Sequence, residues 1–173
     1  MITVISSTNR LGSNTLKVAK AYLEILENQG AECQLMDLCG LPRDIAFTEL
    51  YGQRSDSFQQ NFISLVEKSE KYVFVIPEYN GGFPGILKLF IDAIPPKSWN
   101  NKKAGLVGLS NGAAGALRAM DQFSNVLNYL KVDVISDKPK LSAIDSALNE
   151  QGKVNHEGYF KRLEAHAEKM MGF

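Results

Sequence analysis

Residues 73–88 read VFVIPEYNGGFPGILK, and the rest of the chain is placed around them. The first four residues are apolar and mostly β-branched, which predicts a buried strand. Pro77 and the turn-forming residues after it end that strand, and helical spacing resumes at Ile86. The sequence therefore predicts a strand that ends in an exposed turn. There we expect Tyr79 to lie against a flat ring, while backbone groups freed from the sheet bind the edge of that ring.

The composition fits one globular domain spanning residues 1–173. The chain is 45% hydrophobic and 22% charged, which allows a sizeable core. Lysine plus arginine and aspartate plus glutamate number 19 each, so the formal net charge is zero. A neutral chain has no basic field for nucleic acid or anionic lipid. We therefore expect no nucleic-acid and no membrane partner, and small-molecule chemistry is favoured.

Two cysteines and the first residues bear on the compartment. Cys33 and Cys39 are spaced for neither a redox CxxC pair nor a zinc knuckle, and two cysteines are too few to staple a secreted scaffold. Met1 runs directly into a short β-rich segment without a basic region, unlike a signal peptide or a membrane span. The expectation is a cytoplasmic protein with reduced thiols.

Apolar periodicity predicts five strands that alternate with helices. The expected strands are 2–6, 31–38, 73–76, 104–109 and 132–135. The expected helices begin after Ser13 or Asn14 and near residues 58, 86, 116 and 160, the first ending at Gly30, the second near Lys71 and the third at Pro95-Pro96. Residues 43–55 show no period, and residues 136–157 are expected to form a long polar connection.

Five repeats of strand, loop and helix predict a parallel sheet with helices on both faces, because right-handed crossovers leave little topological choice. The expected fold is α/β, a flavodoxin-like doubly wound five-stranded parallel sheet in three layers. Ligands of such sheets bind outside the carboxyl ends of the strands, at the switch in strand order. The loops after the first, third and fourth strands all lie at that edge.

The loop after the first strand is a candidate phosphate site. It carries hydroxyl, amide and guanidinium groups at a helix N-terminus, and phosphates bind such donors. The loop contains neither GxGxxG nor a Walker lysine, so a monophosphate such as that of FMN fits better than a dinucleotide. Ordinary helix capping by the same residue types is the alternative. The candidate donors are Ser7, Arg10, Ser13, Asn14 and Thr15.

The turn after the third strand is the candidate seat of a flavin ring. Its residues are Pro77, Glu78, Tyr79, Asn80 and Gly81. The alternative is a plain β-turn at Asn80-Gly81, with Tyr79 as a packing residue and Glu78 solvated. Ring binding is favoured because the turn shares its sheet edge with the candidate phosphate loop.

The loop after the fourth strand supports two interpretations. Residues 108–112 match the GxSxG nucleophile elbow at a strand-to-helix turn, so Ser110 is a candidate hydrolase nucleophile. The other interpretation is a small-residue loop, with Ser110, Asn111 and Gly112, whose backbone approaches a ligand closely. We favour the second, because GxSxG residues are common in turns and the chain is short for a hydrolase. The acids and bases that follow Ser110 in the hydrolase order are Asp133 or Asp145 and His156 or His166, and both histidines are expected at the surface.

Trp99 stands in a basic segment, residues 96–103. Two roles are open for it. The ring would shelter a flavin or a nicotinamide, or it would pin the loop.

The residues around Tyr79 resemble a known family, the NAD(P)H-dependent FMN reductases, which include quinone, chromate and azo-dye reductases. Residues 77–81, followed by Pro84-Gly85 and Leu87-Lys88, are similar to the flavin-ring segment of that family. The first loop is similar to the family's phosphate motif, Gly-Ser-x-Arg-x-x-Ser-x-Asn, although Ser6 replaces the glycine and Thr15 the asparagine. The motif residues that stand in place are Ser7, Arg10 and Ser13.

Two further segments extend the resemblance over nearly the whole chain. Residues 110–119 look like the third flavin-contacting loop, with Gly115-Ala116 in place of paired glycines. Residues 148–154 are similar to an acidic-glycine turn before the last helix. The resemblance implies FMN at the interface of a homodimer or homotetramer, with NADPH or NADH and an acceptor taking turns over the flavin. It implies no catalytic acid or base, and a quinone, azo compound, metal oxyanion or free flavin as acceptor.

Two other functions remain as alternatives to an NAD(P)H-dependent reductase. One is a flavodoxin-like FMN electron carrier that does not use NAD(P)H. Carriers that dock on redox partners are usually acidic, and the zero net charge argues against this function. The other, more distant, is a serine hydrolase acting through Ser110.

Overall fold

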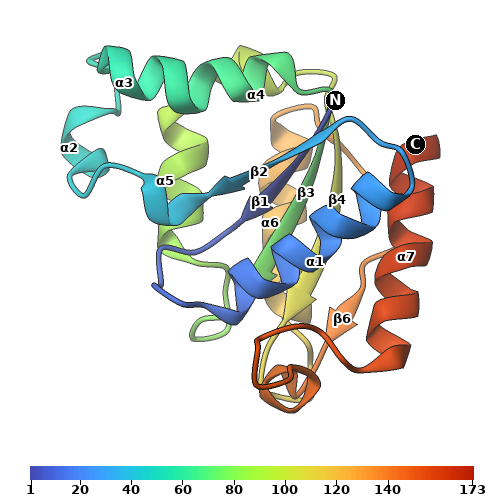
Figure 1. The fold of residues 1–173 in the computed structure, drawn as a ribbon. Coiled ribbons are helices and arrows are strands. Elements are labelled where there is room, and N and C mark those ends of the chain that lie inside the picture. Colours follow the sequence, from blue (N-terminus) through green and yellow to red (C-terminus); the bar gives the residue numbers. More distant parts are fainter.

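The computed structural model describes all of residues 1–173 and contains one parallel sheet (Figure 1). Its strands follow the order β2-β1-β3-β4-β5, as in the flavodoxin-like doubly wound fold, and β6 pairs with β4. This confirms the predicted fold class. The strands are β1 (Ile2–Ser6), β2 (Cys33–Asp37), β3 (Lys71–Pro77), β4 (Lys103–Leu109), β5 (Asp133–Val134) and β6 (Lys140–Leu141).

The central strands are apolar because both of their faces are covered. All of β1 is buried, and β3 is buried from Tyr72 onward. In parallel register, Val4 of β1 pairs with Val73 of β3, which in turn pairs with Gly105 of β4. Strands buried on both faces appear as near-continuous apolar runs, which is why the sequence predicted them well.

The last position of the sheet differs from the prediction. Two short strands share it: β5 pairs with the start of β4, at Lys103 and Ala104, and β6 pairs with its end, at Gly108 and Leu109. The polar connection expected over residues 136–157 therefore contains a strand. A two-residue strand leaves no alternating pattern in the sequence. Backbone hydrogen bonds from Gly108 and Ser110 and the complete burial of Leu141 anchor it.

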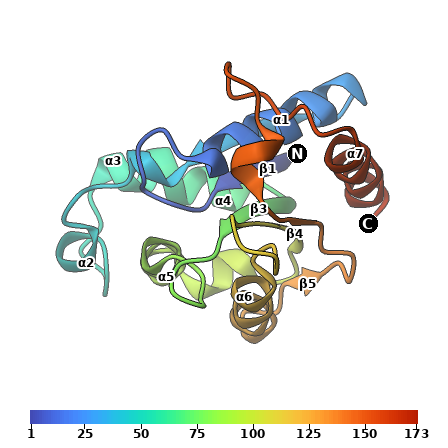
Figure 2. The same cartoon turned by 90° about the horizontal axis from the view of Figure 1, so that it is seen from below.

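Helices cover both faces of the sheet (Figure 2). The helices α1 (Asn14–Asn28) and α7 (Glu157–Gly172) lie on one face, and α5 (Gly85–Ala93) and α6 (Leu117–Tyr129) lie on the other. Residues 56–68 form one helical segment, made of α3 (Asp56–Phe58), a π-helical turn (Gln59–Ile63) and α4 (Ser64–Lys68). This segment ends three residues before the predicted Lys71, because Ser69 is extended. The remaining elements are α2 (Ile45–Thr48) and the 3₁₀ turns Leu38–Gly40, Pro96–Trp99 and Ile144–Ala147.

The buried Trp99 ring holds its loop against the core, and it lies far from the edge of the sheet where ligands bind. It is fully buried, and its ring packs edge-on against Tyr72, at 5.2 Å between centroids, and against Phe90, at 6.0 Å. The turn that carries it precedes β4, so Trp99 is at the amino end of the strands. A role in sheltering a flavin or nicotinamide ring at the carboxyl edge is therefore ruled out by position.

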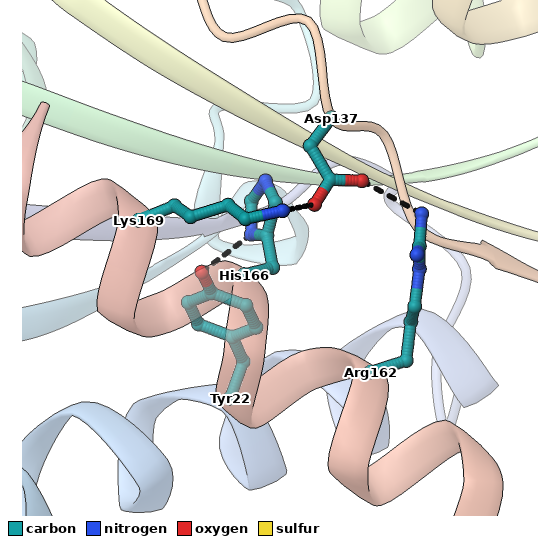
Figure 3. Close-up of polar contacts among 5 residues, drawn as sticks. All are labelled: Tyr22, Asp137, Arg162, His166 and Lys169. Carbon is teal, nitrogen blue, oxygen red and sulfur yellow. Dashed lines mark hydrogen bonds and ion pairs between the residues drawn. The ribbon is translucent and has the colours of Figure 1, made fainter.

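A polar cluster joins α1 to α7, with Tyr22 and His166 in the core and the basic partners of Asp137 at the surface (Figure 3). His166 is fully buried, so the expectation of a surface histidine was wrong for this residue. Its Nδ1 lies 2.6 Å from the Tyr22 hydroxyl, and nearby Asp137 accepts hydrogen bonds from Arg162 and Lys169. Gly105 of β4 makes room for the imidazole, because a Cβ at that position would lie 2.6 Å from the His166 Cε1 atom. His166 lies beside apolar Ala167 on the inner face of α7. The expectation of a surface position did not take this neighbour into account.

No helix combines the length and the apolar character that crossing a bilayer requires.

Candidate flavin site

Three loops converge at the carboxyl edge of the sheet and enclose a cavity of about 470 Å³. They follow β1, β3 and β4, and β1 and β3 flank the point where the strand order reverses. The turn after β6 supplies a fourth wall. The lining residues are Arg10–Thr15, Pro77–Tyr79, Leu109–Asn111, Ile144 and Asp145.

The β1–α1 loop presents an unoccupied set of hydrogen-bond donors to this cavity. Ser13 caps α1, and its Oγ accepts from the Leu16 N–H at 3.1 Å. The backbone N–H groups of residues 11–15 donate to no protein acceptor, and the Arg10 guanidinium forms no ion pair. Successive free amides at a helix N-terminus, next to a guanidinium, are the donors that a phosphate monoester requires. The residues present therefore fit the phosphate of FMN.

A hydrogen bond between side chains braces the first loop against the turn after β3. The Thr8 Oγ1 and the Tyr79 hydroxyl are 2.9 Å apart, and Thr8 Oγ1 also accepts from the Arg10 N–H. Ser7, in contrast, is fully buried, donates to the Ile5 carbonyl at 3.3 Å and does not line the cavity.

Thr8 was not among the site residues predicted from the sequence. One residue separates the serine from the arginine in the phosphate motif, and one residue separates Thr8 from Arg10, whereas two separate Ser7 from it. Counting back from Arg10 by this spacing places the Gly-Ser start of the motif at Ser7-Thr8, while Arg10 and Ser13 keep their positions. In that register Thr8, rather than Ser7, takes the serine position.

The turn after β3 is a two-residue hairpin. Asn80 and Gly81 have φ angles of 51° and 80°, as a type I′ turn requires. The Tyr79 N–H donates to the Gly82 carbonyl at 2.9 Å, and the Gly82 N–H donates to the Tyr79 carbonyl at 3.0 Å. The backbone of Tyr79 is therefore already paired, unlike the expectation that it is free for a ring edge. The N–H groups of Asn80 and Gly81 stay unpaired at the tip, outside the cavity lining.

Glu78 links three elements and is not the solvated side chain that the plain-turn alternative assumed. Its side chain is 15% exposed, and its Oε1 lies 3.5 Å from an Arg118 nitrogen on α6. Its backbone N–H donates to the Leu109 carbonyl at the end of β4. The other carboxylate oxygen is buried without a hydrogen-bond partner. Glu78 thus holds the end of β3 against β4 and α6.

The β4–α6 loop lacks the contacts of a hydrolase. The Ser110 hydroxyl donates to the Gly112 carbonyl at 2.9 Å. His156 caps α7, and His166 bonds to Tyr22 in the core. No histidine bonds to Ser110, so no nucleophile and base pair forms.

The small residues of that loop serve packing. A Cβ on Gly108 would lie 2.5 Å from the Gly115 carbonyl oxygen, so the glycine lets the loop fold back over the end of β4. The close approach of residues 110–112 to a ligand stays a prediction, because the tight contact belongs to Gly108, and a Cβ on Gly112 would meet only the Ser110 Oγ at 3.9 Å. Asn111 and Ser110 line the cavity, whereas Gly112 does not.

Asp145 also lines the cavity. The sequence had suggested it only as a candidate acid of a serine hydrolase. Its carboxylate accepts from Asn14 Nδ2 and from Asn111 Nδ2, each at 2.6 Å. Its backbone N–H donates to Asn111 Oδ1 at 3.1 Å. No local signal could have found this bridge, because the partners lie 131 and 34 residues away.

The fold is that of the flavodoxin-like α/β proteins, and its cavity sets an aromatic wall, Tyr79, beside a loop of free hydrogen-bond donors. Residues 1–143 match the profile of the family described as NADPH-dependent FMN reductase, and the chain belongs to that family. Membership makes the protein an oxidoreductase that works with FMN and a nicotinamide cofactor.

Three curated relatives are similar to this chain over most of their length. An NAD(P)H-dependent FMN reductase of Pseudomonas aeruginosa is 28% identical over 155 residues, which cover 87% of this chain and 82% of the relative. A 2-hydroxy-1,4-benzoquinone reductase of a Burkholderia species is 28% identical, covering 97% and 92%. A quinone reductase of Pseudomonas putida is 25% identical, covering 89% and 84%.

Solved structures share the fold. The flavoenzyme NAD(P)H:(acceptor) oxidoreductase FerB of Paracoccus denitrificans superposes with a TM-score of 0.78 at 23% identity, covering 99% of this chain and 94% of that one. A Streptococcus pneumoniae flavodoxin gives a TM-score of 0.63 at 16% identity, covering 99% and 96%. At these identities the likeness supports the architecture alone.

Proposed function

We propose that the cavity binds FMN and that the protein passes two electrons from NAD(P)H, through the flavin, to a small organic acceptor. The phosphate would be held by the N–H groups of residues 11–15, with Arg10, Ser13 and Thr15. The ring would lie along Pro77–Tyr79 and the loop that carries Ser110 and Asn111. Of the residues predicted from the sequence, those that line the cavity are proposed to contact the cofactor, whereas Ser7, Asn80, Gly81 and Gly112 lie outside the lining. Thr8 and Asp145 are added as residues that hold the loops in place.

One observation carries this proposal. A row of five amides without protein acceptors and an unpaired guanidinium line the same cavity as Tyr79. Free amides occur at the start of any helix, but here they stand beside an unpaired guanidinium and an aromatic wall in one cavity. It is the arrangement that a ligand with a phosphate at one end and a flat ring at the other requires.

The protein contributes position rather than a reacting group. When bound, FMN supplies the ring that takes a hydride from the nicotinamide and returns two electrons to the acceptor. The first loop fixes the phosphate end, the braced Tyr79 orients the ring, and the β4–α6 loop limits its movement. We assign no catalytic acid or base to the chain.

The test is the absorption spectrum of the purified protein. We expect a yellow protein that releases FMN on denaturation and bleaches when NADPH is added without oxygen. A colourless protein that cannot be reconstituted with FMN would contradict the proposal.

A flavodoxin-like carrier is the second candidate, because flavodoxins share this architecture. Anaerobic addition of NADPH alone separates the two functions. A reductase bleaches at once, whereas a carrier stays yellow until a partner reductase is supplied. The zero net charge favours the reductase.

Among acceptors, we propose quinones and azo compounds first, since relatives carry both names. Metal oxyanions and free flavins are further candidates. Steady-state rates with a benzoquinone, an azo dye, chromate and free FMN, each at saturating NADPH and NADH, would rank the acceptors and the two nicotinamides.

We also propose that the chain works as a homodimer or homotetramer with the flavin near an interface, each subunit being one domain of residues 1–173. Tyr51 and Tyr129 are 95% and 88% exposed and line an apolar groove of about 750 Å³ at the C-terminal ends of α5 and α6. This groove lies at the amino end of the strands, so it supports an interface between subunits, whereas the place of the flavin near an interface rests on the family resemblance alone. Light scattering of the native chain and of Tyr129→Glu tests this, with dissociation of the variant expected. The unpaired Cys33 and Cys39 support a reducing, cytoplasmic location.

A further inference from the structure

Asp145 joins two walls of the cavity that come from distant parts of the chain. Its carboxylate bonds at 2.6 Å to Asn14, the first residue of α1, and at 2.6 Å to Asn111, in the β4–α6 loop. Asn111 is held at two points, because its Oδ1 accepts from the Asp145 N–H. Hydrogen bonds to an ionised acceptor are shorter and stronger than neutral ones.

The segment that carries Asp145 is anchored in the core. Its neighbour Ile144 is 3% exposed, and Ala147 is 1% exposed. The Ile144 N–H donates to the Ser110 carbonyl at 3.2 Å, so this turn is fastened to the β4–α6 loop by its backbone as well. A carboxylate on a fixed base can set the position of the groups that it holds.

The bridge and the Thr8–Tyr79 hydrogen bond lie on different walls of the cavity. Thr8 and Tyr79 tie the first loop to the turn after β3. Asp145 ties the start of α1 to the β4–α6 loop. Together the two contacts connect all three loops that the proposed function assigns to the cofactor.

We propose that Asp145 is a positioning residue that sets the spacing between the phosphate loop and the β4–α6 loop, and so selects ligands that span both. This inference rests on the proposed function, in which the phosphate of FMN binds one loop and its ring the other. Asp145 acts through Asn14 and Asn111 and is not itself a catalytic residue.

Charge repulsion alone predicts the opposite change in FMN affinity when Asp145 is removed. The Asp145 carboxylate lines a cavity proposed to take a phosphate, so its charge alone would repel the ligand and its removal would strengthen binding. Loss of the bridge instead frees two loops, and the ligand must then order them. The direction of the change therefore separates the two roles.

The experiment compares FMN and riboflavin binding to the full chain, followed by flavin fluorescence quenching. For Asp145→Ala we expect FMN affinity to fall about tenfold, because two charge-assisted hydrogen bonds are lost. Riboflavin lacks the phosphate and does not span both loops, so its affinity should change less than about twofold on the same argument. The matched control is Glu157→Ala, which removes an exposed carboxylate paired with Lys161 on α7, outside the cavity, and should leave both affinities unchanged.

A mutant cycle tests whether Asp145 acts through its partners. In a chain that already carries Asn14→Ala and Asn111→Ala, adding Asp145→Ala should change FMN affinity no further. If Asp145→Ala does not fold, Asp145→Asn, which keeps the shape and one acceptor oxygen, should show a smaller loss in the same direction.

Three results overturn the inference while leaving the proposed function intact. They are unchanged or tighter FMN binding by the variant, an equal loss for riboflavin, and a full additional loss in the cycle. Failure of the unaltered chain to bind FMN overturns the proposed function instead, and this inference with it.

Discussion

The Tyr22 hydroxyl lies 2.6 Å from Nδ1 of His166, in the core between α1 and α7 (Figure 3). Burial lowers the pKa of His166 to about 4, against the opposing charge of Asp137. Burial, reinforced by Asp137, raises the pKa of Tyr22. Both side chains are therefore neutral at pH 7, which is how a polar pair is accommodated in an apolar core.

This pair predicts that the protein loses stability as the pH falls from about 6.5 to about 4. In that window the unfolded chain protonates His166 and the folded chain does not, so the free energy of unfolding rises with pH. The loss should reach about 3 kcal/mol at the lower end, given the size of the pKa shift. Urea unfolding across pH 4–7.5 measures it.

A His166→Asn variant is the comparison for that pH dependence. This variant carries no titratable group at position 166, so its free energy of unfolding should change less between pH 6.5 and pH 4. Asp137 has a lowered pKa because of its hydrogen bond to Lys169, so its contribution disappears only at still lower pH. An unchanged slope in the variant would show that His166 is not the titrating group.

Gly105→Ala should destabilise the fold without affecting ligand binding. The new Cβ would lie 2.6 Å from both His166 Cε1 and Met170 Sδ, and overpacking of this kind costs about 1–3 kcal/mol. Gly85→Ala is the control, because no atom lies within 4 Å of a Cβ there. Urea unfolding compares the two variants, and equal stability would contradict the packing argument.

Gly81→Ala should strain the hairpin beside the cavity. With φ at 80°, alanine costs about 1 kcal/mol relative to glycine. Gly112→Ala, in the neighbouring loop, has no such φ and only a distant contact, so it should be better tolerated. Thermal melts of both variants give the comparison, and a larger loss for Gly112→Ala would argue against the type I′ turn.

Tyr79→Phe should weaken FMN binding a few-fold while keeping the ring. It removes the 2.9 Å bond to Thr8 that braces two loops, a contact worth about 1 kcal/mol. Thr8→Val removes the same bond from the other side. Fluorescence titration should give the double variant no more effect than either single one, whereas additive losses would show that the two side chains act separately.

Arg10→Ala and Ser13→Ala should both weaken FMN binding several-fold, by loss of a charge-assisted bond and of a hydroxyl donor. Only Ser13→Ala should also lower stability, by about 1 kcal/mol, because Ser13 caps α1. Titration and urea unfolding of each variant separate the two roles. Unchanged FMN affinity in both would remove the phosphate assignment.

The class of fold and the edge that carries the site were available from the sequence. Strands β1, β3 and β4 are apolar over nearly their full length, since both faces are covered, and such runs can be recognised locally. Ser13 caps α1 and Gly30 follows it with a φ of 79°, and both are local signals as well. Three loops after parallel strands must then share one edge, whatever the details of packing.

Only the tertiary structure decided which side chains in those loops are free and which are engaged. The Thr8–Tyr79 bond joins residues 71 apart, and the Asp145 bridge reaches 131 residues back to Asn14. Trp99 and His166 are buried by elements far away in the chain. Such contacts form between segments that meet only after the sheet is built. The sequence does not show which partners these side chains meet, because each is an ordinary polar or aromatic residue in its own local context. The helical spacing of Leu163, Ala167 and Met170 does place His166 on the inner face of α7.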